Sequence, residues 1–165
     1  QRVTLINSLT GVKPINMIGT QNLLGKANLS LVSSIFHLGA SPAMFGFVIR
    51  PDSVPRDTLE NLREHPFLTV NHVNSDIIEN AHQTSARYNK EENEFEKCNL
   101  HEEYLAEHQS PFVKESKIKY SFKDQVQTEH NQIDFGKLNK IIGEYKSKVN
   151  LDQMIVNFKF CSCSE

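Results

Sequence analysis

Short apolar runs separated by turn residues fill the first half of the chain, a pattern typical of β-strands. Residues 15–19 form one such run, and residues 22–26, with Gly25 among them, predict a hairpin connection after it. Residues 27–36 alternate in part between small polar and apolar side chains. They predict a strand with one face in a core and the other on a polar site. Residues 43–49 are almost wholly apolar and predict a strand buried on both faces.

The clearest helix start lies further along the chain. Asp57 stands three residues ahead of Glu60, which is the spacing of a capping box with Asp in the place of Ser. Leu59 and Leu62 begin an apolar face. Pro66 ends the pattern, because a proline disfavours helical backbone in the residue before it. The sequence therefore predicts a helix that Asp57 caps and that ends before Pro66.

Beyond this helix the pattern is less regular. Residues 67–73 are rich in β-branched side chains and predict a strand, after which Ser75 and Asp76 predict the cap of a second helix. The remaining predicted elements are a charged surface loop at 89–96, a short helix at 101–108, and strands at 118–126 and 154–161.

This succession of short strands with two or three brief helices favours a mainly β fold, an antiparallel β-barrel with short helical insertions. Long alternating strand–helix repeats are missing, so a doubly wound parallel sheet is not expected. No internal repeat, low-complexity segment or linker divides the chain, and its length is that of one ordinary domain. We therefore expect a single domain over residues 1–165.

Charge and hydropathy narrow the class of protein. The 18 basic and 20 acidic residues leave a net charge of -2, and the chain has no basic stripe of the kind that nucleic-acid binders carry. No apolar run reaches the ~18 residues that a membrane span requires. The chain starts at Gln1 without a signal segment after it, so we expect a trimmed start or a fragment. We therefore expect the protein to bind neither nucleic acid nor a membrane.

The three cysteines favour a reducing compartment. Cys98, Cys161 and Cys163 are few and odd in number, which argues against a secreted disulfide scaffold and favours the cytoplasm. Together with His101 they could hold a soft metal, but zinc sites usually carry two paired ligand spacings and only one loose pair is present. Ordinary thiols are the preferred interpretation, and we predict no metal site.

Familiar catalytic motifs are missing from the sequence. It has no Gly-rich phosphate loop, no His-Glu-x-x-His, no Gly-x-Ser-x-Gly and no Cys-x-x-Cys. His101 and His108 lie seven residues apart, but the acidic stretch between them is typical of a solvated surface. A hydrolase with its own nucleophile and base is therefore weakly supported, and we predict no catalytic side chain.

Two polar clusters fit a ligand cradle better. The first comprises Asn28, Ser30, Ser33 and Ser34, whose uncharged donors and acceptors could hydrogen-bond to the edge of a heterocycle or to a phosphate. The alternative is a strand with a solvated outer face, and the pattern alone does not decide between the two.

The second cluster precedes the predicted helix. Arg50, Arg56 and Thr58 place two guanidinium groups and a hydroxyl just ahead of a helix N-terminus. The free N–H groups, the positive end of the helix dipole and the forked Arg donors all favour a phosphate monoester there. The alternative is a capped helix with two surface arginines, and from the residues alone it stays open.

Several short motifs occur in the order and spacing of a known family over about residues 12–122. They are Asn28-Leu29-Ser30, Ser33-Ser34-Ile35-Phe36, Ser41-Pro42, Arg56-Asp57-Thr58-Leu59-Glu60-Asn61, Phe67-Leu68-Thr69-Val70-Asn71, His82-Gln83-Thr84-Ser85-Ala86 and Glu94-Phe95-Glu96. This order resembles the flavin reductase-like, FMN-binding split-barrel family, the relatives of flavoredoxin.

The resemblance implies an antiparallel split β-barrel that forms homodimers and holds FMN in a groove near the dimer interface. It implies that hydride passes from NAD(P)H through flavin N5 to a small electron acceptor or to free flavin. Asn28, Ser30, Ser33 and Ser34 would line the isoalloxazine and ribityl chain, whereas Arg56 and Thr58 would hold the phosphate. The implied cofactor-binding residues are Asn28, Leu29, Ser30, Ser33, Ser34, Arg50, Arg56, Asp57, Thr58, Asn71 and Ser85.

The C-terminal part departs from the family. Residues 130–165 are atypical, with only an echo of the family at 141–145 inside a Lys-rich stretch. The same cradle also serves a second class of protein, a non-catalytic flavin- or heme-binding split barrel that acts as a carrier, sensor or interaction module. An NAD(P)H-dependent flavin reductase is the preferred prediction.

Overall fold

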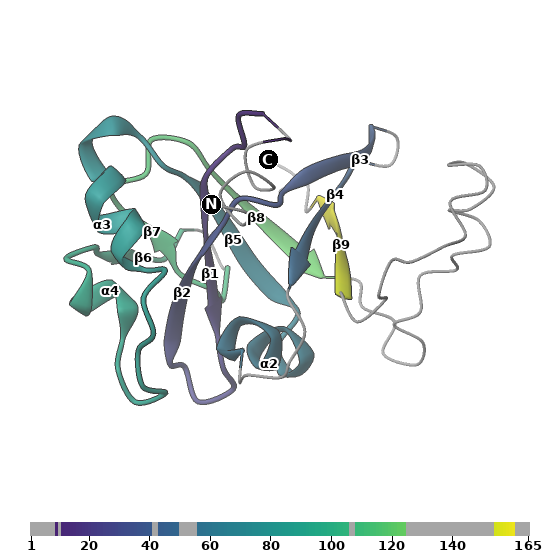
Figure 1. Cartoon of the computed structure of the whole chain (residues 1–165). Helices are drawn as coiled ribbons and strands as arrows, with labels where there is room; N and C mark the ends of the chain where they lie inside the picture. Colours follow the sequence, from purple (N-terminus) through teal and green to yellow (C-terminus); the bar gives the residue numbers. More distant parts are fainter. Residues whose placement is uncertain are drawn as a thin grey trace.

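The computed structural model describes residue 9 and residues 11–40, 43–49, 56–105, 108–124 and 154–160. Its described strands form a seven-stranded sheet in the order β2-β1-β5-β8-β9-β4-β3, in which every pairing is antiparallel (Figure 1). The strands are β1 (Asn16–Gln21), β2 (Ala27–Val32), β3 (Phe36–Ala40), β4 (Ala43–Ile49), β5 (Phe67–His72), β8 (Lys119–Asp124) and β9 (Met154–Phe160). The mainly β, antiparallel fold predicted from the sequence is confirmed.

Short helices and one small hairpin complete the described fold. The helices are α2 (Asp57–Glu64), α3 (Ile78–Gln83), α4 (Glu94–Lys97) and a 3-10 helix (Ser75–Ile77), and the hairpin consists of β6 (Glu102–Glu103) and β7 (Phe112–Val113). None of the helices that the structure describes has the length and apolar character to cross a membrane.

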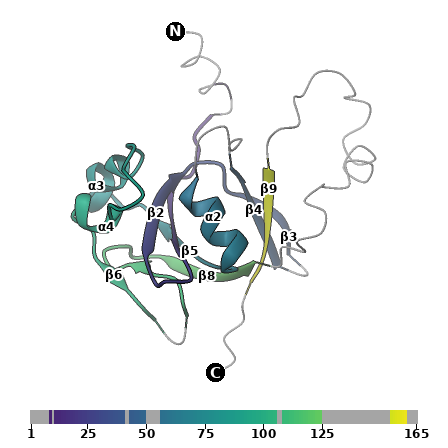
Figure 2. The ribbon, with the colours of Figure 1, turned by 90° about the horizontal axis from the view of Figure 1, so that it is seen from below.

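Helix α2 lies across one end of the curved sheet, with the strands around it (Figure 2). Its buried Leu59 and Leu62 belong to the same apolar cluster as residues of β1, β4, β5 and β8, so the helix fills the barrel from this end. Burying each leucine contributes roughly 1.5–3 kcal/mol. The cluster comprises Ile18, Phe47, Ile49, Leu59, Leu62, Leu68, Val70 and Phe122.

Strand β1 is buried on both faces because the molecule has a second core. Ile18 faces the barrel, whereas the adjacent Met17 packs in a separate cluster with Leu29 of β2, Ile77 and Phe95. The small helices α3 and α4 cover this outer face of β1 and β2 (Figure 1). On β2 the alternation leaves Leu29 in the outer cluster and turns its neighbours toward the barrel.

The hairpin between β1 and β2 forms as predicted. The Asn22 side-chain oxygen accepts hydrogen bonds from the Leu24 and Lys26 N–H groups at 3.0 and 2.9 Å. Gly25 has a φ of 81°, a conformation that favours glycine. These contacts set the register that places Thr20 opposite Asn28.

The predicted strand at 27–36 is wrong in one respect, because it is two strands. β2 ends at Val32 and β3 begins at Phe36. Between them the Ser34 hydroxyl donates to the Val48 carbonyl and accepts from the Val48 N–H, both at 3.1 Å. The side chain thus takes the backbone partners that would have continued the ladder, and the chain turns there from one end of the sheet order to the other.

Three helix predictions need correction. Asp57 is the first residue of α2, and the cap is Arg56, which provides no side-chain cap hydrogen bond. Asn74, and not Ser75 or Asp76, caps the 3-10 helix that precedes α3, by accepting from the Asp76 N–H at 3.0 Å. The predicted helix at 101–108 is wrong, because its described part holds strand β6.

The charged segment 89–96, predicted as a surface loop, contains the start of α4. The Asn93 side chain caps this helix, and the aromatic ring of Phe95 is buried in the outer core. The strands predicted at 118–126 and 154–161 are present as β8 and β9. Arg50, Cys161 and Cys163 lie outside the described residues, as do residues 125–153.

Candidate functional site

Five polar side chains of β1, β2 and α2 form one hydrogen-bonded network. We call this part of the molecule the α2 end of the barrel. The Asn28 amide donates to the hydroxyl oxygens of Thr20 and Thr58, both at 3.0 Å. The Thr58 hydroxyl donates to the Ser30 oxygen at 2.9 Å, and the Asn61 amide donates to Thr20 at 3.2 Å. The structure therefore brings together three residues of the predicted cradle, Asn28, Ser30 and Thr58.

Strand alternation and helix periodicity explain this meeting. Asn28 and Ser30 are two residues apart on β2 and share its barrel face, whereas Thr58 and Asn61 are three apart on α2 and share a helix face. Thr20 joins them from β1, and it is fully buried. Buried polar groups of this kind are stable only when they are hydrogen-bonded, and these satisfy one another.

Beside this network, the start of α2 offers donors to an anion. Within the described residues no side chain caps the helix, and the buried Nε of Arg56 has no hydrogen-bond partner. A helix N-terminus with free N–H groups and a guanidinium N–H without a partner favours a phosphate or carboxylate. Asp57 and Glu60 lie in the same turn, and the Lys90 ammonium offsets the charge of Glu60 from 2.7 Å.

Glu94 is a site residue that sequence reasoning did not single out. Its carboxylate accepts a hydrogen bond from the Leu29 N–H at 3.3 Å and so reaches the outer edge of β2. Burial raises its pKa, against the effect of two backbone N–H groups that stabilise the charge. Glu94 starts the short motif Glu94-Phe95-Glu96, which was the available signal. Asn61 ends the motif that starts at Arg56, so the same kind of signal was available for it, whereas Thr20 belongs to none of the motifs.

The two serines that follow β2 are placed differently from each other. Ser33 is exposed, and Ser34 is half-buried with its hydroxyl committed to the Val48 backbone. Ser34 fixes the turn between β2 and β3. Both serines follow Val32, which pairs with Asn16, so the structure does not bring them together with Asn28 at the Thr20 end of the ladder.

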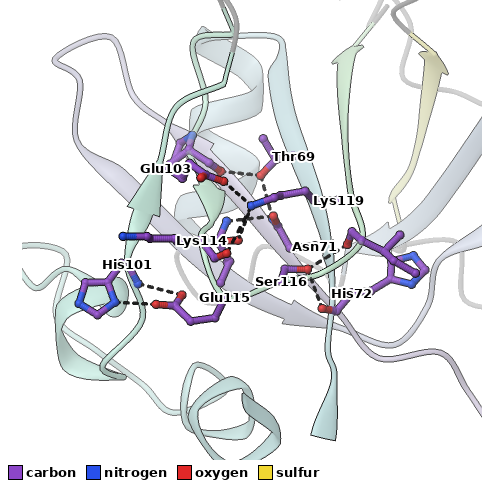
Figure 3. A network of polar contacts seen from close by, with 12 residues as sticks. Thr69, Asn71, His72, His101, Glu103, Lys114, Glu115, Ser116 and Lys119 are labelled. Atoms are coloured by element: carbon purple, nitrogen blue, oxygen red, sulfur yellow. Dashed lines mark hydrogen bonds and ion pairs between the residues drawn. The ribbon is translucent and has the colours of Figure 1, made fainter. Parts of the chain in front are cut away.

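Asn71 belongs to another network, shown in Figure 3. Its amide donates to the Met17 carbonyl at 3.2 Å and to the Thr69 hydroxyl at 3.0 Å, and its oxygen accepts from the Val113 N–H at 2.9 Å. Lys119 reaches the same segment, pairs with Glu103 and donates to the Val113 carbonyl at 3.2 Å. This fully buried asparagine thus joins β5 to β1 and β7.

Ser85 also lies apart from the α2 end in its contacts. Its hydroxyl donates to the His82 carbonyl at 2.7 Å, next to the end of α3, and the residue is exposed. In the part of the chain that the structure describes, no three His, Cys, Asp or Glu side chains come close enough together to hold a metal ion. Cys98, the described member of the cysteine set, is a buried thiol.

Comparisons with known proteins agree on one family. The sequence model of the flavin reductase like domain matches residues 12–145. A crystal structure of a candidate flavin reductase with a split barrel domain from Shewanella frigidimarina NCIMB 400 is 43% identical, with a TM-score of 0.79 over 97% of this chain and 70% of that one. No curated protein sequence matches the chain.

More distant structures share the fold alone. The NADH:FAD oxidoreductase SgcE6 of Streptomyces globisporus C-1027 is 10% identical, with a TM-score of 0.68 over 98% of this chain and 81% of that one. The flavoredoxin of Desulfovibrio vulgaris (Miyazaki F) is 13% identical, with a TM-score of 0.64 over 91% and 70%. The family match, the close relative and the antiparallel barrel together lead to one conclusion: the chain belongs to the flavin reductase like domain family and has its split-barrel fold.

Proposed function

We propose that the chain binds FMN at the α2 end of the barrel and is an NAD(P)H-dependent flavin reductase that passes hydride through the flavin to a small acceptor or to free flavin. The observation that supports this most is the polar network of buried Asn28 and Thr58 and half-buried Ser30, beside the Arg56 Nε that has no hydrogen-bond partner among the described residues, in a chain of this family. Fold alone does not define the chemistry, so the proposal depends on this site.

The residues present fit a flavin phosphate. Arg56 has a buried N–H group without a partner among the described residues, and a phosphate oxygen is the kind of acceptor that would satisfy it. The first turn of α2 adds N–H groups without a side-chain cap. Thr58 adds a hydroxyl, whose present bond to Ser30 would be exchanged for one to the ligand.

The uncharged polar groups on the barrel face of β2 suit the rest of an FMN molecule. Asn28 and Ser30 offer donors and acceptors for ribityl hydroxyls and for the polar edge of a ring. Ser33 lies at the other end of β2, after Val32, which pairs with Asn16. A bound flavin supplies the hydride chemistry itself, and the protein has to bind, orient and shield it. This division of work agrees with the lack of a nucleophile–base pair in the sequence.

The non-catalytic alternative, a flavin- or heme-binding module, uses the same cradle and differs in its response to nicotinamide. The test is anaerobic mixing of the FMN-loaded protein with NADH and then with NADPH while flavin absorbance is followed. Bleaching at enzyme-like rates is the expected result and also identifies the preferred nucleotide. A flavin that stays oxidised under both nucleotides, but is reduced by dithionite, would assign the chain to the module.

We also propose that the protein works as a homodimer in the cytoplasm. The dimer follows from the family resemblance, and the compartment follows from the few, odd-numbered cysteines, of which Cys98 is a buried thiol. Light scattering at micromolar concentration should give twice the chain mass of 18.9 kDa. A mass equal to that of one chain would contradict the dimer.

A further inference from the structure

The polar network at the α2 end is closed to solvent. Asn28 is 8% exposed, Thr58 is 9% exposed and Thr20 is fully buried. A flavin therefore cannot reach these three side chains unless a neighbouring segment of the chain moves. Among the described segments that border the network, the one with the weakest attachment is the one expected to move.

The elements that carry the network are attached strongly. The antiparallel ladder joins β2 to β1 over its whole length, from Ala27 to Val32. Helix α2 is fixed by Leu59 and Leu62, which are 4% and 3% exposed in the barrel core. Movement of either element would break ladder hydrogen bonds or expose apolar surface to water, and both changes are costly.

A short segment between α3 and α4, residues 89–93, bridges the elements that carry the network. We call it the strap. The Lys90 ammonium pairs with the Glu60 carboxylate of α2 at 2.7 Å, two residues after Thr58. Lys26, which directly precedes β2, donates to the Lys90 carbonyl and lies 3.9 Å from the Glu91 carboxylate. The strap thus connects the start of β2 to the first turn of α2.

The two ends of the strap are anchored, whereas its middle is exposed. Before the strap, Tyr88 packs against the outer core, and after it Phe95 is 1% exposed within that core. Asn89, Lys90 and Glu91 are exposed. The middle can therefore swing outward between two fixed ends without uncovering apolar surface.

The contacts that hold the middle of the strap are weak ones. The Lys90 and Glu60 side chains are 69% and 41% exposed, and the Glu91 side chain is 95% exposed. An ion pair in water contributes little net stability, because each charge is already solvated and two long side chains lose freedom when they pair. The strap is therefore the described segment beside the network that opens most easily.

We propose that the strap is a gate over the α2 end, that the Lys90–Glu60 ion pair is its latch, and that flavin enters and leaves while this latch is open. A ligand then waits for the same opening on its way in and on its way out, so the latch sets the rate of exchange. Lys90 holds the strap and does not itself bind the ligand. The inference rests on the proposed function, since FMN is the ligand that the gate admits.

The test measures flavin exchange by stopped-flow fluorescence in the wild type and in Lys90→Ala. Association and dissociation of FMN should both become about two- to fivefold faster by the same factor, so that the equilibrium affinity stays within about twofold. Riboflavin has no phosphate and should show the same acceleration. As a control, Lys117→Ala removes another exposed 2.7 Å ion pair, to Asp76, and should leave the rates unchanged.

A reversed ion pair tests the latch itself. The double variant Lys90→Glu with Glu60→Lys keeps one positive and one negative charge at these positions, so it should return both rates to within about twofold of the wild type. Rates that stay fast in this variant would contradict a latch made by the pair.

Two further results would overturn the proposal. Unchanged rates in Lys90→Ala would show that the strap does not limit exchange. A loss of FMN affinity that riboflavin does not share would make Lys90 a contact to the phosphate and not a latch.

Hydrogen exchange of the flavin-free protein separates a failure of this inference from a failure of the proposed function. The Glu92 N–H donates to the Asn89 carbonyl at 2.8 Å, and the Asn89 N–H donates to the Glu92 carboxylate at 2.8 Å. A strap released from α2 loses the support for this turn, so both amides should exchange about two- to fivefold faster in Lys90→Ala and at the wild-type rate in Lys117→Ala. Faster exchange in a chain that binds no flavin would keep the latch and refute the proposed function alone. Flavin binding with unchanged exchange would refute the gate.

Discussion

The two ends of the barrel differ in the side chains that line them. At the α2 end, Thr20, Asn28, Ser30, Thr58 and Asn61 satisfy one another, and the unsatisfied atom is the Arg56 Nε at the start of the helix. At the other end, a pocket of about 220 Å³ is lined mostly by apolar and aromatic side chains, with Phe45, Tyr120 and Phe122 among them.

This difference indicates two kinds of recognition. A network of groups that already bond to one another holds its donors in fixed directions, so it is preorganised and favours a ligand that joins the network at its edge. A pocket lined by rings selects its ligand by shape and by apolar contact. The α2 end thus suits a charged ligand with many polar contacts, whereas the ring-lined end offers mainly apolar contact.

Arg56→Ala should give the largest effect, and it acts at the α2 end alone. Loss of one charged hydrogen bond to the phosphate should weaken FMN binding by roughly 1.5–3 kcal/mol, or about 10–150-fold. Fluorescence titration of FMN measures it. Alanine at Arg63, an exposed arginine of the same helix, should leave FMN affinity within about twofold. Equal losses in the two variants would place the phosphate elsewhere.

Leucine at the two buried asparagines should separate the two ends in stability. Asn28→Leu removes the amide that donates hydrogen bonds to the Thr20 and Thr58 hydroxyl oxygens. It should lower the free energy of unfolding by about 1–3 kcal/mol. Asn16→Leu removes no hydrogen bond within the described residues and should lower it by less than about 0.5 kcal/mol, as should the surface control Ser33→Ala. Urea unfolding provides the values. Similar losses at Asn28 and Asn16 would remove the contrast between the ends.

The comparison of stabilities should be made above pH 7, because burial lowers the pKa of His108. Because the pKa of His108 is lower in the folded chain, the unfolded chain takes up the proton first as the pH drops through the ordinary value of 6.5. The free energy of unfolding should therefore fall over this range. One such group changes the free energy of unfolding by at most about 1.4 kcal/mol per pH unit. The slope should flatten in His108→Gln and persist in the exposed control His82→Gln, and an unchanged slope in both would contradict this assignment.

Glu94→Gln should give the smallest effect and should act in the stabilising direction. Burial raises the pKa of Glu94, so the folded state binds the proton more tightly and stability falls as pH rises above the ordinary value of 4.5. Glutamine keeps an oxygen for the Leu29 N–H and removes the charge. The melting temperature should rise at pH 7 and less at pH 5, with no rise for the exposed control Glu96→Gln. A fall at pH 7 would show that the charge stabilises β2.

Local signals explain what the sequence could predict of the fold. The β1–β2 hairpin was predictable because Gly25 lies within one short connection. The break at Ser34 was not, because it depends on Val48, fourteen residues away, which is brought close only by folding. The predicted caps of α2 and of the 3-10 helix were wrong by one or two residues. The cap position depends on where the backbone becomes helical, and in the structure it is Arg56 for α2 and Asn74 for the 3-10 helix.

The candidate site divides in the same way. Asn28, Ser30 and Thr58 were predictable as a set because motifs in the order of a known family linked β2 to α2. Thr58 lies 30 residues from Asn28 and 28 residues from Ser30 in the sequence. Asn71 has the residue type of a ligand contact, but a partner from β7 saturates its oxygen, and no pattern in the sequence announces that strand.

A competition titration of FMN against riboflavin on the wild-type chain tests the proposed phosphate site most directly. The two ligands share the ring and ribityl chain and differ in the phosphate that Arg56 and the α2 N-terminus are proposed to hold. One FMN per chain, bound about 10–150-fold more tightly than riboflavin, is the predicted result. Equal affinity for the two flavins, or no binding of either, would contradict it.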